Sequence, residues 1–188
     1  MSKIIITLLT ALLISIASAG FDLNQALAAE EGENAYLLLN VESDGVLSAR
    51  DLVFKNVDTG DEVWIRDLVN TGRSGPAKYI MEPLPAGEYY LSRINPIVNA
   101  RNNAPSIEVG EEDGVITILA DTINYIGDFI FKSRERGRGV ASSFDYEPSS
   151  DTLMAAVSSE RELFESMDVV ISIAGNAPVL VDKRLLGL

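Results

Sequence analysis

The chain of 188 residues is 47% hydrophobic and 23% charged, and it contains neither Cys nor His. This composition is typical of one globular domain, and the missing residue types exclude Ser-His-Asp triads, Cys nucleophiles, zinc sites and Cys-ligated iron–sulfur clusters. The 28 Asp and Glu against 15 Lys and Arg give a formal net charge of −13, which repels phosphate backbones and argues against nucleic acid as a partner.

The first nineteen residues have the pattern of a signal peptide. Lys3 precedes an uncharged stretch over 4–16, and Ala17-Ser18-Ala19 supplies the small-x-small cleavage site. The alternative, a membrane anchor, is disfavoured because such a stretch covers only about 20 Å of helix against about 30 Å of hydrocarbon. We expect cleavage near Ala19 and a mature protein that is exported, periplasmic or extracellular, with no membrane span, 14 bases and 28 acids. A second small-x-small site, Ala26-Leu27-Ala28, leaves the exact mature N-terminus open.

Residues 20–34 are expected to form a flexible lead-in. From Ala35 onward the sequence consists of short β-branched and aromatic runs separated by Gly, Pro, Asn and Asp. This pattern predicts a mainly β domain over 35–147, an Ig-like or transthyretin-like antiparallel β-sandwich. The expected strands are 35–41, 50–57, 62–68, 77–82, 87–94, 106–109, 114–119, 122–132 and 140–146. Asp58-Thr59-Gly60-Asp61 is expected to form a hairpin loop, and Gly114 to need a positive φ.

The alternation of apolar residues at every second position, which is typical of a strand, is clearest near the end of this domain. Ile123, Tyr125, Phe129 and Phe131 are expected on one face of a strand, and Val140, Phe144 and Tyr146 on one face of the next. We expect these two faces to meet in the core.

Residues 148–188 form an α+β extension that we expect to pack on the sandwich. A helical stripe with a cap at Ser149 or Ser150 runs through Leu153, Ala156, Val157, Leu163, Phe164 and Met167. Ser159 with Glu162 matches a capping box, which favours two short helices over one. Residues 168–174 and 178–181 are predicted strands.

Two motifs carry a family resemblance. Residues 84–91, LPAGEYYL, look like the strand start "LPxGxYxL" of transthyretin-like and carboxypeptidase-regulatory-like β-sandwich domains, and 122–128, TINYIGD, resembles the "G-x-x-Y-x-G" strand of bacterial exported proteins of unknown function with that sandwich. Ala120-Asp121 stands where those proteins often carry Gly. The resemblance covers about 35–132 and implies a fold, but it transfers no functional residue.

No catalytic set converges in the sequence, so we expect no enzyme activity and no cofactor. The remaining enzymatic alternative is a hydrolase of cell-wall glycans that uses two carboxylates. The acidic stretches 58–62 and 111–113 offer oxygen ligands without the spacing of an EF-hand, so calcium binding stays open.

The candidate binding residues are basic. Residues 132–139 concentrate four bases between two predicted strands, and 92–105 is the longest stretch expected to be irregular. If both lie at one end of the sandwich, they form a positive patch for an anionic partner, made of Arg93, Arg101, Lys132, Arg134, Arg136 and Arg138. The alternative for each segment is local pairing or packing within the domain. Trp64 could stack on a ligand or be buried by the helical extension.

These observations predict an exported cell-envelope binding or protein-interaction module, with an envelope protein or an anionic glycan as partner. A structural accessory subunit of an envelope assembly is a further alternative, which an exposed strand edge or apolar patch would favour. The oligomeric state does not follow from the sequence.

Overall fold

The computed structural model describes residues 35–68, 79–99 and 102–188. The predicted signal peptide, the lead-in, Arg101 and the beginning of the predicted strand 77–82 therefore lie outside the described residues. No helix in the described ranges is long and apolar enough to cross a membrane.

The first sheet is built around two long strands, β1 (Tyr36–Gly45) and β9 (Thr122–Arg136), which run parallel. β4 (Ile80–Pro83) pairs with the other side of β1. The free side of β9 is shared end to end: β11 (Asp168–Ile171) pairs with its beginning and β10 (Gly139–Glu147) with its remainder. β12 (Val179–Leu180) completes this sheet next to β11.

The second sheet is antiparallel and centres on β2 (Ser48–Asn56) and β5 (Gly87–Asn99). β3 (Glu62–Ile65) flanks β2. The far side of β5 pairs in turn with β8 (Val115–Ile118), β7 (Ile107–Glu108) and β6 (Asn102–Asn103), and the 3₁₀ turn η1 (Glu111–Asp113) precedes β8.

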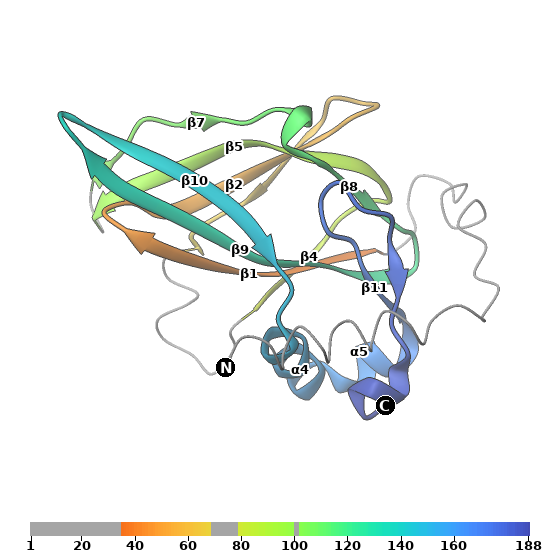
Figure 1. The fold of residues 1–188 in the computed structure, drawn as a ribbon. Coiled ribbons are helices and arrows are strands. Elements are labelled where there is room, and N and C mark those ends of the chain that lie inside the picture. Colours follow the sequence, from red (N-terminus) through yellow and green to blue (C-terminus); the bar gives the residue numbers. More distant parts are fainter. Residues whose placement is uncertain (1–34, 69–78, 100–101) are drawn as a thin grey trace.

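The two sheets pack face to face, so the predicted β-sandwich is confirmed (Figure 1). Leu37 and Leu39 of β1 meet Leu52 and Phe54 of β2 in the core between the sheets. Two pairs depart from the expected antiparallel pattern, because β9 runs parallel to both β1 and β11.

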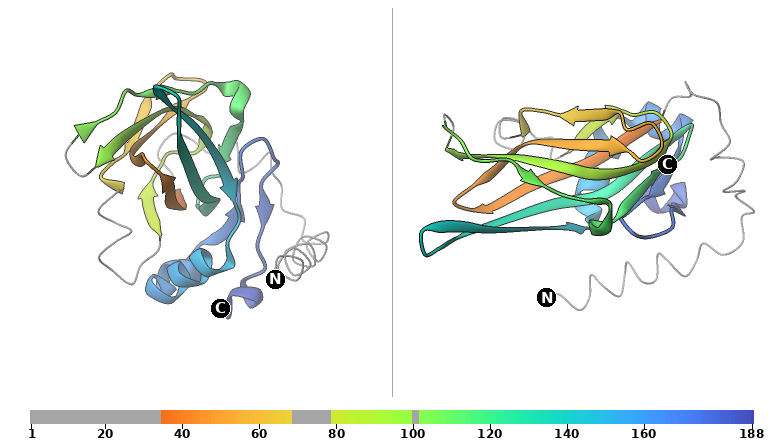
Figure 2. Two further views of the ribbon diagram at one scale, coloured as in Figure 1. Left: turned by 60° about the vertical axis from the view of Figure 1, so that its left-hand side comes forward. Right: turned by 90° about the horizontal axis from the view of Figure 1, so that it is seen from above.

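A second core lies on the other face of the first sheet. The helices α4 (Ser150–Ser159) and α5 (Arg161–Ser166) cover one end of that face (Figures 1 and 2). The 3₁₀ turn η2 (Lys183–Leu186), which comes after β12 in the chain, adds Leu186 to the same core. The predicted helical stripe is buried there, with Leu153, Ala156, Val157 and Phe164 packed against Leu38, Ile123 and Tyr125. The extension thus adds both a layer and two strands to the sandwich.

The predicted helix break is confirmed, but the predicted capping box is wrong. Ser149 caps α4 and accepts a hydrogen bond from the Thr152 N–H. Glu160 is both the C-cap of α4 and the N-cap of α5, and no side chain caps the second helix. The turn predictions hold, since Gly60 and Gly114 have φ of 76° and 119°.

The predicted common face of β9 is wrong. Ile123 and Tyr125 point toward the helices, whereas Phe129 and Phe131 point into the core between the sheets. The register with β1 shifts between Leu38 and Asn40, at a bulge where Gly127 has a φ of 94°. An extra residue at a bulge reverses the alternation of every residue after it. On β10, Phe144 and Tyr146 meet Phe129 as expected, but Val140 is 46% exposed.

The stretch 92–105 is not the long irregular loop that the sequence suggested. β5 continues to Asn99, and the chain returns through β6 after a short connection. Pro96 is tolerated inside this strand because it lies opposite Ala49, next to a bulge in β2.

Candidate functional site

The hairpin of β9 and β10 extends past the rest of its sheet. The register with β1 ends at the pair Gly45–Ser133, so from Arg134 onward the hairpin has no third strand among the described residues. We call residues 132–143 the arm. All of them except Ser133 are exposed, and the arm projects from the end of the sandwich opposite the helices (Figures 1 and 2). An isolated pair of strands is marginally stable in water.

Two features fix the base and the tip of the arm. Ser133 is buried and its hydroxyl accepts a hydrogen bond from the Leu47 N–H at 2.8 Å while donating to the Leu47 carbonyl at 3.2 Å. Gly137 and Arg138 form a two-residue turn between the paired Arg136 and Gly139. Gly137 has a φ of 62°, and Gly at the first central position is typical of a type II′ turn.

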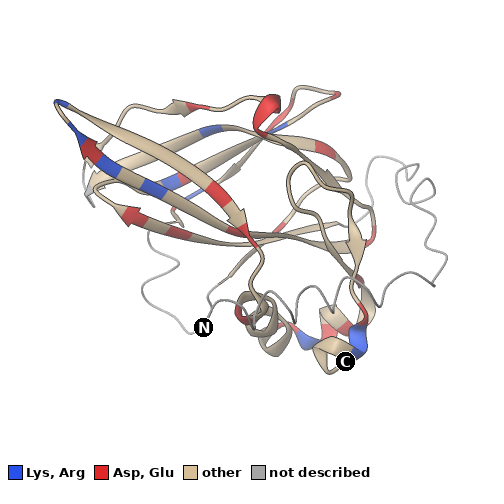
Figure 3. Ribbon diagram, in the orientation of Figure 1, with Lys and Arg blue, Asp and Glu red and all other residues tan. Residues whose placement is uncertain are grey.

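The arm carries the strongest concentration of positive charge in the sequence (Figure 3). Arg134, Arg136 and Arg138 form no ion pair with any described residue. Lys132 lies at the base, where its Nζ is 4.0 Å from a Glu147 carboxylate oxygen, and its register partner on β1 is Asp44. The unpaired charge is therefore concentrated toward the tip.

Arg93 does not join this group. It lies on the outer face of the second sheet, where its guanidinium is 2.8 Å from Glu62 and 3.8 Å from Glu108. It also stacks near Trp64, with 5.3 Å between the guanidinium carbon and the ring centroid. The structure thus brings together Lys132, Arg134, Arg136 and Arg138, places Arg93 elsewhere, and does not describe Arg101.

Trp64 faces away from Val63 and Ile65 as the sequence indicated, and it is 36% exposed. The predicted burial by the helical extension is wrong, because the helices pack on the other sheet. Trp64 and Arg93 instead flank the buried Val53 as its partners on β3 and β5. Trp64 and Arg93 thus cover the Val53 side chain, which explains their arrangement.

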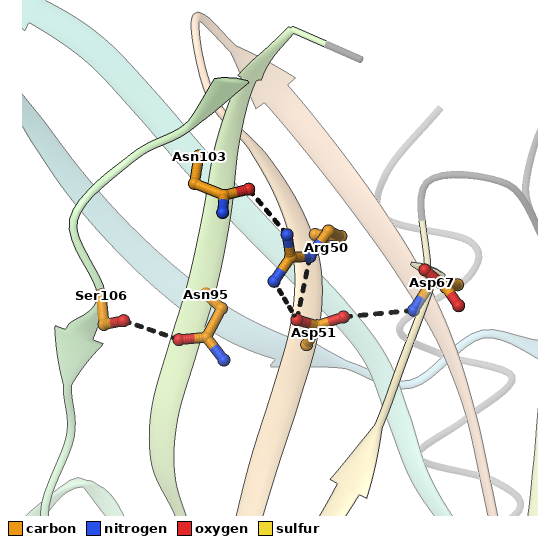
Figure 4. A network of polar contacts seen from close by, with 6 residues as sticks. All are labelled: Arg50, Asp51, Asp67, Asn95, Asn103 and Ser106. Atoms are coloured by element: carbon orange, nitrogen blue, oxygen red, sulfur yellow. Dashed lines mark hydrogen bonds and ion pairs between the residues drawn. The ribbon is translucent and has the colours of Figure 1, made fainter. Parts of the chain in front are cut away.

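A network of polar side chains lies in the second sheet near the base of the arm. It is close to the start of β2, where Ser48 pairs with Ile97 and the preceding Leu47 donates a hydrogen bond to Ser133. Asp51 is buried and accepts hydrogen bonds from Arg50 at 2.6 and 2.9 Å and from the Asp67 N–H at 3.2 Å (Figure 4). Arg50 also donates to Asn103 at 2.6 Å. These bonds connect the start of β2 to β6 across the intervening strand β5, and to the residues that follow β3.

A hollow of about 570 Å³ lies beside β10, below the arm. Its walls come from three places in the chain: Ser142–Tyr146 of β10, Ile173, Ala174 and Asn176 of the turn after β11, and Asp113 of η1. The backbone of this turn is fixed to the second sheet, because the Gly175 N–H donates to the Val115 carbonyl at 2.8 Å. The Tyr146 hydroxyl is buried nearby without a hydrogen-bond partner in the described chain, and burial raises its pKa well above the ordinary value.

The other buried titratable cluster has a structural explanation. Asp128 accepts hydrogen bonds from Tyr125, Thr152 and Asn40, and thus joins β9 to α4 and β1. Burial, together with the charge of Asp128, holds the pKa of the Tyr125 hydroxyl far above its ordinary value. No group of three or more Asp or Glu in the described ranges is arranged to hold a metal ion.

Sequence reasoning found the basic segment but missed the strand edge and the hollow. The edge is free because β10 pairs with β9 and with no other described strand, a sheet order that no local pattern encodes. The signal that was available is the uncharged run 139–144, GVASSF, directly after the basic segment. Comparisons of the chain with protein-family models, curated proteins and solved structures gave no match.

Proposed function

We propose that this protein is an exported cell-envelope interaction module that captures an anionic partner on the arm and works without catalysis. The observation that carries the proposal is the set of three arginines that form no ion pair with any described residue, held on a projecting hairpin in a chain of net charge −13. Guanidinium groups match carboxylate and phosphate oxygens, and a positive site on a negative protein selects its partner by sign. The sequence pattern of residues 1–19 supports export.

The resemblance of 84–91 to transthyretin-like domains agrees with this assignment. Leu84 is buried, Gly87 has a φ of 149° at the start of β5, and Tyr89 and Leu91 share the face toward the core. Domains of that kind serve as scaffolds, and their function resides in what the scaffold presents. Here the presented element is the arm.

Capture of envelope components by the mature chain, residues 20–188, tests the proposal. We compare the wild type, the variant R134S/R136S/R138S and the control R66S, which removes an exposed arginine directly after β3, far from the arm in the sequence. A partner retained by the wild type and the control should be lost by the triple variant, and it should be released as salt rises from about 0.1 M to about 1 M, because the screening length falls from about 10 Å to about 3 Å. Equal capture by the triple variant would overturn the proposal.

One observation favours the hydrolase alternative. Asp113 and Asp145 both line the hollow beside β10, and glycoside hydrolysis needs two carboxyl groups that flank the scissile bond. A hydrolase would release reducing ends from cell-wall glycans, and D113N and D145N would each abolish the release. The interaction module predicts no release by the wild type.

A further inference from the structure

The outer edge of β10 is free in the described chain, and it differs from the edges that proteins usually leave exposed. β10 pairs with β9 only. Natural edge strands are protected by charged residues or proline, yet 139–144 is an uncharged run without proline. The opposite edge of the arm, in β9, carries Arg134, Glu135 and Arg136 and is protected in the usual way.

The turn geometry determines which backbone groups this edge offers. A two-residue hairpin turn is closed by a hydrogen-bonded pair, here Arg136 and Gly139, and bonded and non-bonded pairs then alternate along the ladder. Val140, Ser142 and Phe144 fall on the non-bonded positions. Their N–H and C=O groups point away from β9, toward a strand that the described chain does not supply.

The side chains beside the edge differ between its two faces. Gly139, Ala141 and Ser143 lie on the face that carries Lys132, Arg134 and Arg136, because these residues are register partners across the hairpin. Neighbouring strands lie about 4.8 Å apart, so small residues on β10 leave room for the arginines to reach across to a third strand. The other face presents Val140, Ser142 and Phe144, which continue toward the core.

The hollow lies at the lower end of the same edge, because its lining includes Ser142–Tyr146. Phe144, Ile173 and Ala174 provide apolar wall there, beside the carboxylates of Asp113 and Asp145. The arginines are concentrated at the upper end. The edge therefore offers a row of backbone groups with a positive tip and, at its base, a hollow whose wall is partly apolar.

We propose that the edge of β10 binds an extended segment of a partner protein as an added β-strand. The segment has Asp or Glu on the side chains that face Arg134 and Arg136, and apolar side chains on the alternate positions, one of which enters the hollow. This proposal rests on the proposed function and specifies its partner class. Strand addition of this kind gives affinity through the backbone and specificity through pockets for alternate side chains.

The test uses the mature chain labelled with ¹⁵N and a short, end-blocked peptide of alternating Glu and Val, with a Lys and Val peptide as its control. On binding of the acidic peptide, the amides of Val140, Ser142 and Phe144 should become protected from hydrogen exchange. Those of Ala141 and Ser143, which already bond to β9, should change little. No saturable protection with the acidic peptide, or equal protection with the basic one, would overturn the proposal.

Two variants separate backbone pairing from charge. S142P removes an outward N–H that the pair with β9 does not use, so it should retain the fold and lose the peptide, whereas S142A should bind as the wild type does. R134S/R136S/R138S should weaken binding roughly tenfold, because each exposed ion pair contributes only a small part of the affinity. If S142P binds normally and the arginine variant does not, strand addition is wrong while the anion-binding module stands. Protection of the three amides that grows with protein concentration alone would show a second copy on the edge and would also overturn the proposal.

Discussion

The hydroxyl of Tyr125 donates a hydrogen bond to the carboxylate of Asp128 at 2.9 Å and accepts one from the Ser149 N–H at 2.8 Å. These bonds span the bulge in β9 and attach the start of α4 to the sheet. The same bulge turns Phe129 and Phe131 toward the opposite core and directs the rest of β9 into the arm. The cluster thus links the helical layer to the strand that forms the arm.

Two tyrosine substitutions should differ sharply in stability. Y125F removes the donor to Asp128 and the acceptor for Ser149, and should lower the free energy of unfolding by about 1–3 kcal/mol because buried polar groups are left unpaired. Y146F removes a buried hydroxyl that has no partner among the described residues, and should be neutral or stabilising. Denaturant unfolding of both variants measures the difference. Equal destabilisation would contradict the assigned hydrogen bonds.

Stability should fall at alkaline pH. Burial raises the pKa of the Tyr125 and Tyr146 hydroxyls in the fold, whereas in the unfolded chain both ionise near pH 10. Above that pH the unfolded state binds fewer protons than the folded state, so the free energy of unfolding decreases as pH rises. Denaturant unfolding at a series of pH values above and below 10 checks this, and Y146F should show a shallower decrease than the wild type. An unchanged slope in Y146F would contradict the burial of that hydroxyl.

Gly127 should not tolerate a side chain. It has a φ of 94°, and a Cβ there would lie 3.3 Å from the Glu147 carbonyl oxygen, so G127A should cost about 1–3 kcal/mol. G139A is the matched control, since its Cβ would have no neighbour closer than 4.0 Å and its φ is not in the left-handed region. Thermal unfolding of the two variants compares them, and equal melting temperatures would argue against the bulge.

The extension should be required for the fold. A chain that ends after Pro148 lacks α4, α5 and β11, and it exposes Leu38, Ile123 and Tyr125 on the first sheet. We expect it to unfold at a lower temperature than residues 20–188, or without a cooperative transition, by calorimetry. A shortened chain as stable as the full mature chain would show that the second core is dispensable.

The sequence predicted the positions of helices, strands and turns better than it predicted which strands pair with each other. Gly and Asp marked the turns at 58–61 and 112–114, where Gly60 and Gly114 have positive φ, and the helical stripe located the second core. The parallel pairing of β1 with β9 could not be predicted, since contacts between distant strands leave no local pattern. Gly127 within a strand was a readable sign of the bulge, and it explains why strict alternation failed on β9.

In the candidate site, likewise, local features could be predicted from the sequence and contacts between distant strands could not. The basic residues 132–138 are evident from the composition of one segment, whereas Arg93 lies where the predicted strand 87–94 overlaps the stretch 92–105 that was expected to be irregular. Its pairing with Glu62 and Glu108 depends on three strands that the sequence does not place side by side. The free edge of β10 depends on the whole sheet order, in which β10 pairs with β9 and with no other described strand.

Cross-linking in the cell that produces the protein tests the central claim, that the arm is the binding surface. A photoreactive residue replaces in turn Val140 on the arm, Trp64 on the second sheet and Met154 on α4, which are 46%, 36% and 42% exposed and therefore comparably accessible. We expect a discrete cross-linked product from position 140 alone, and its loss when R134S/R136S/R138S is added. A discrete product from position 64 or 154, with none from position 140, would contradict the account.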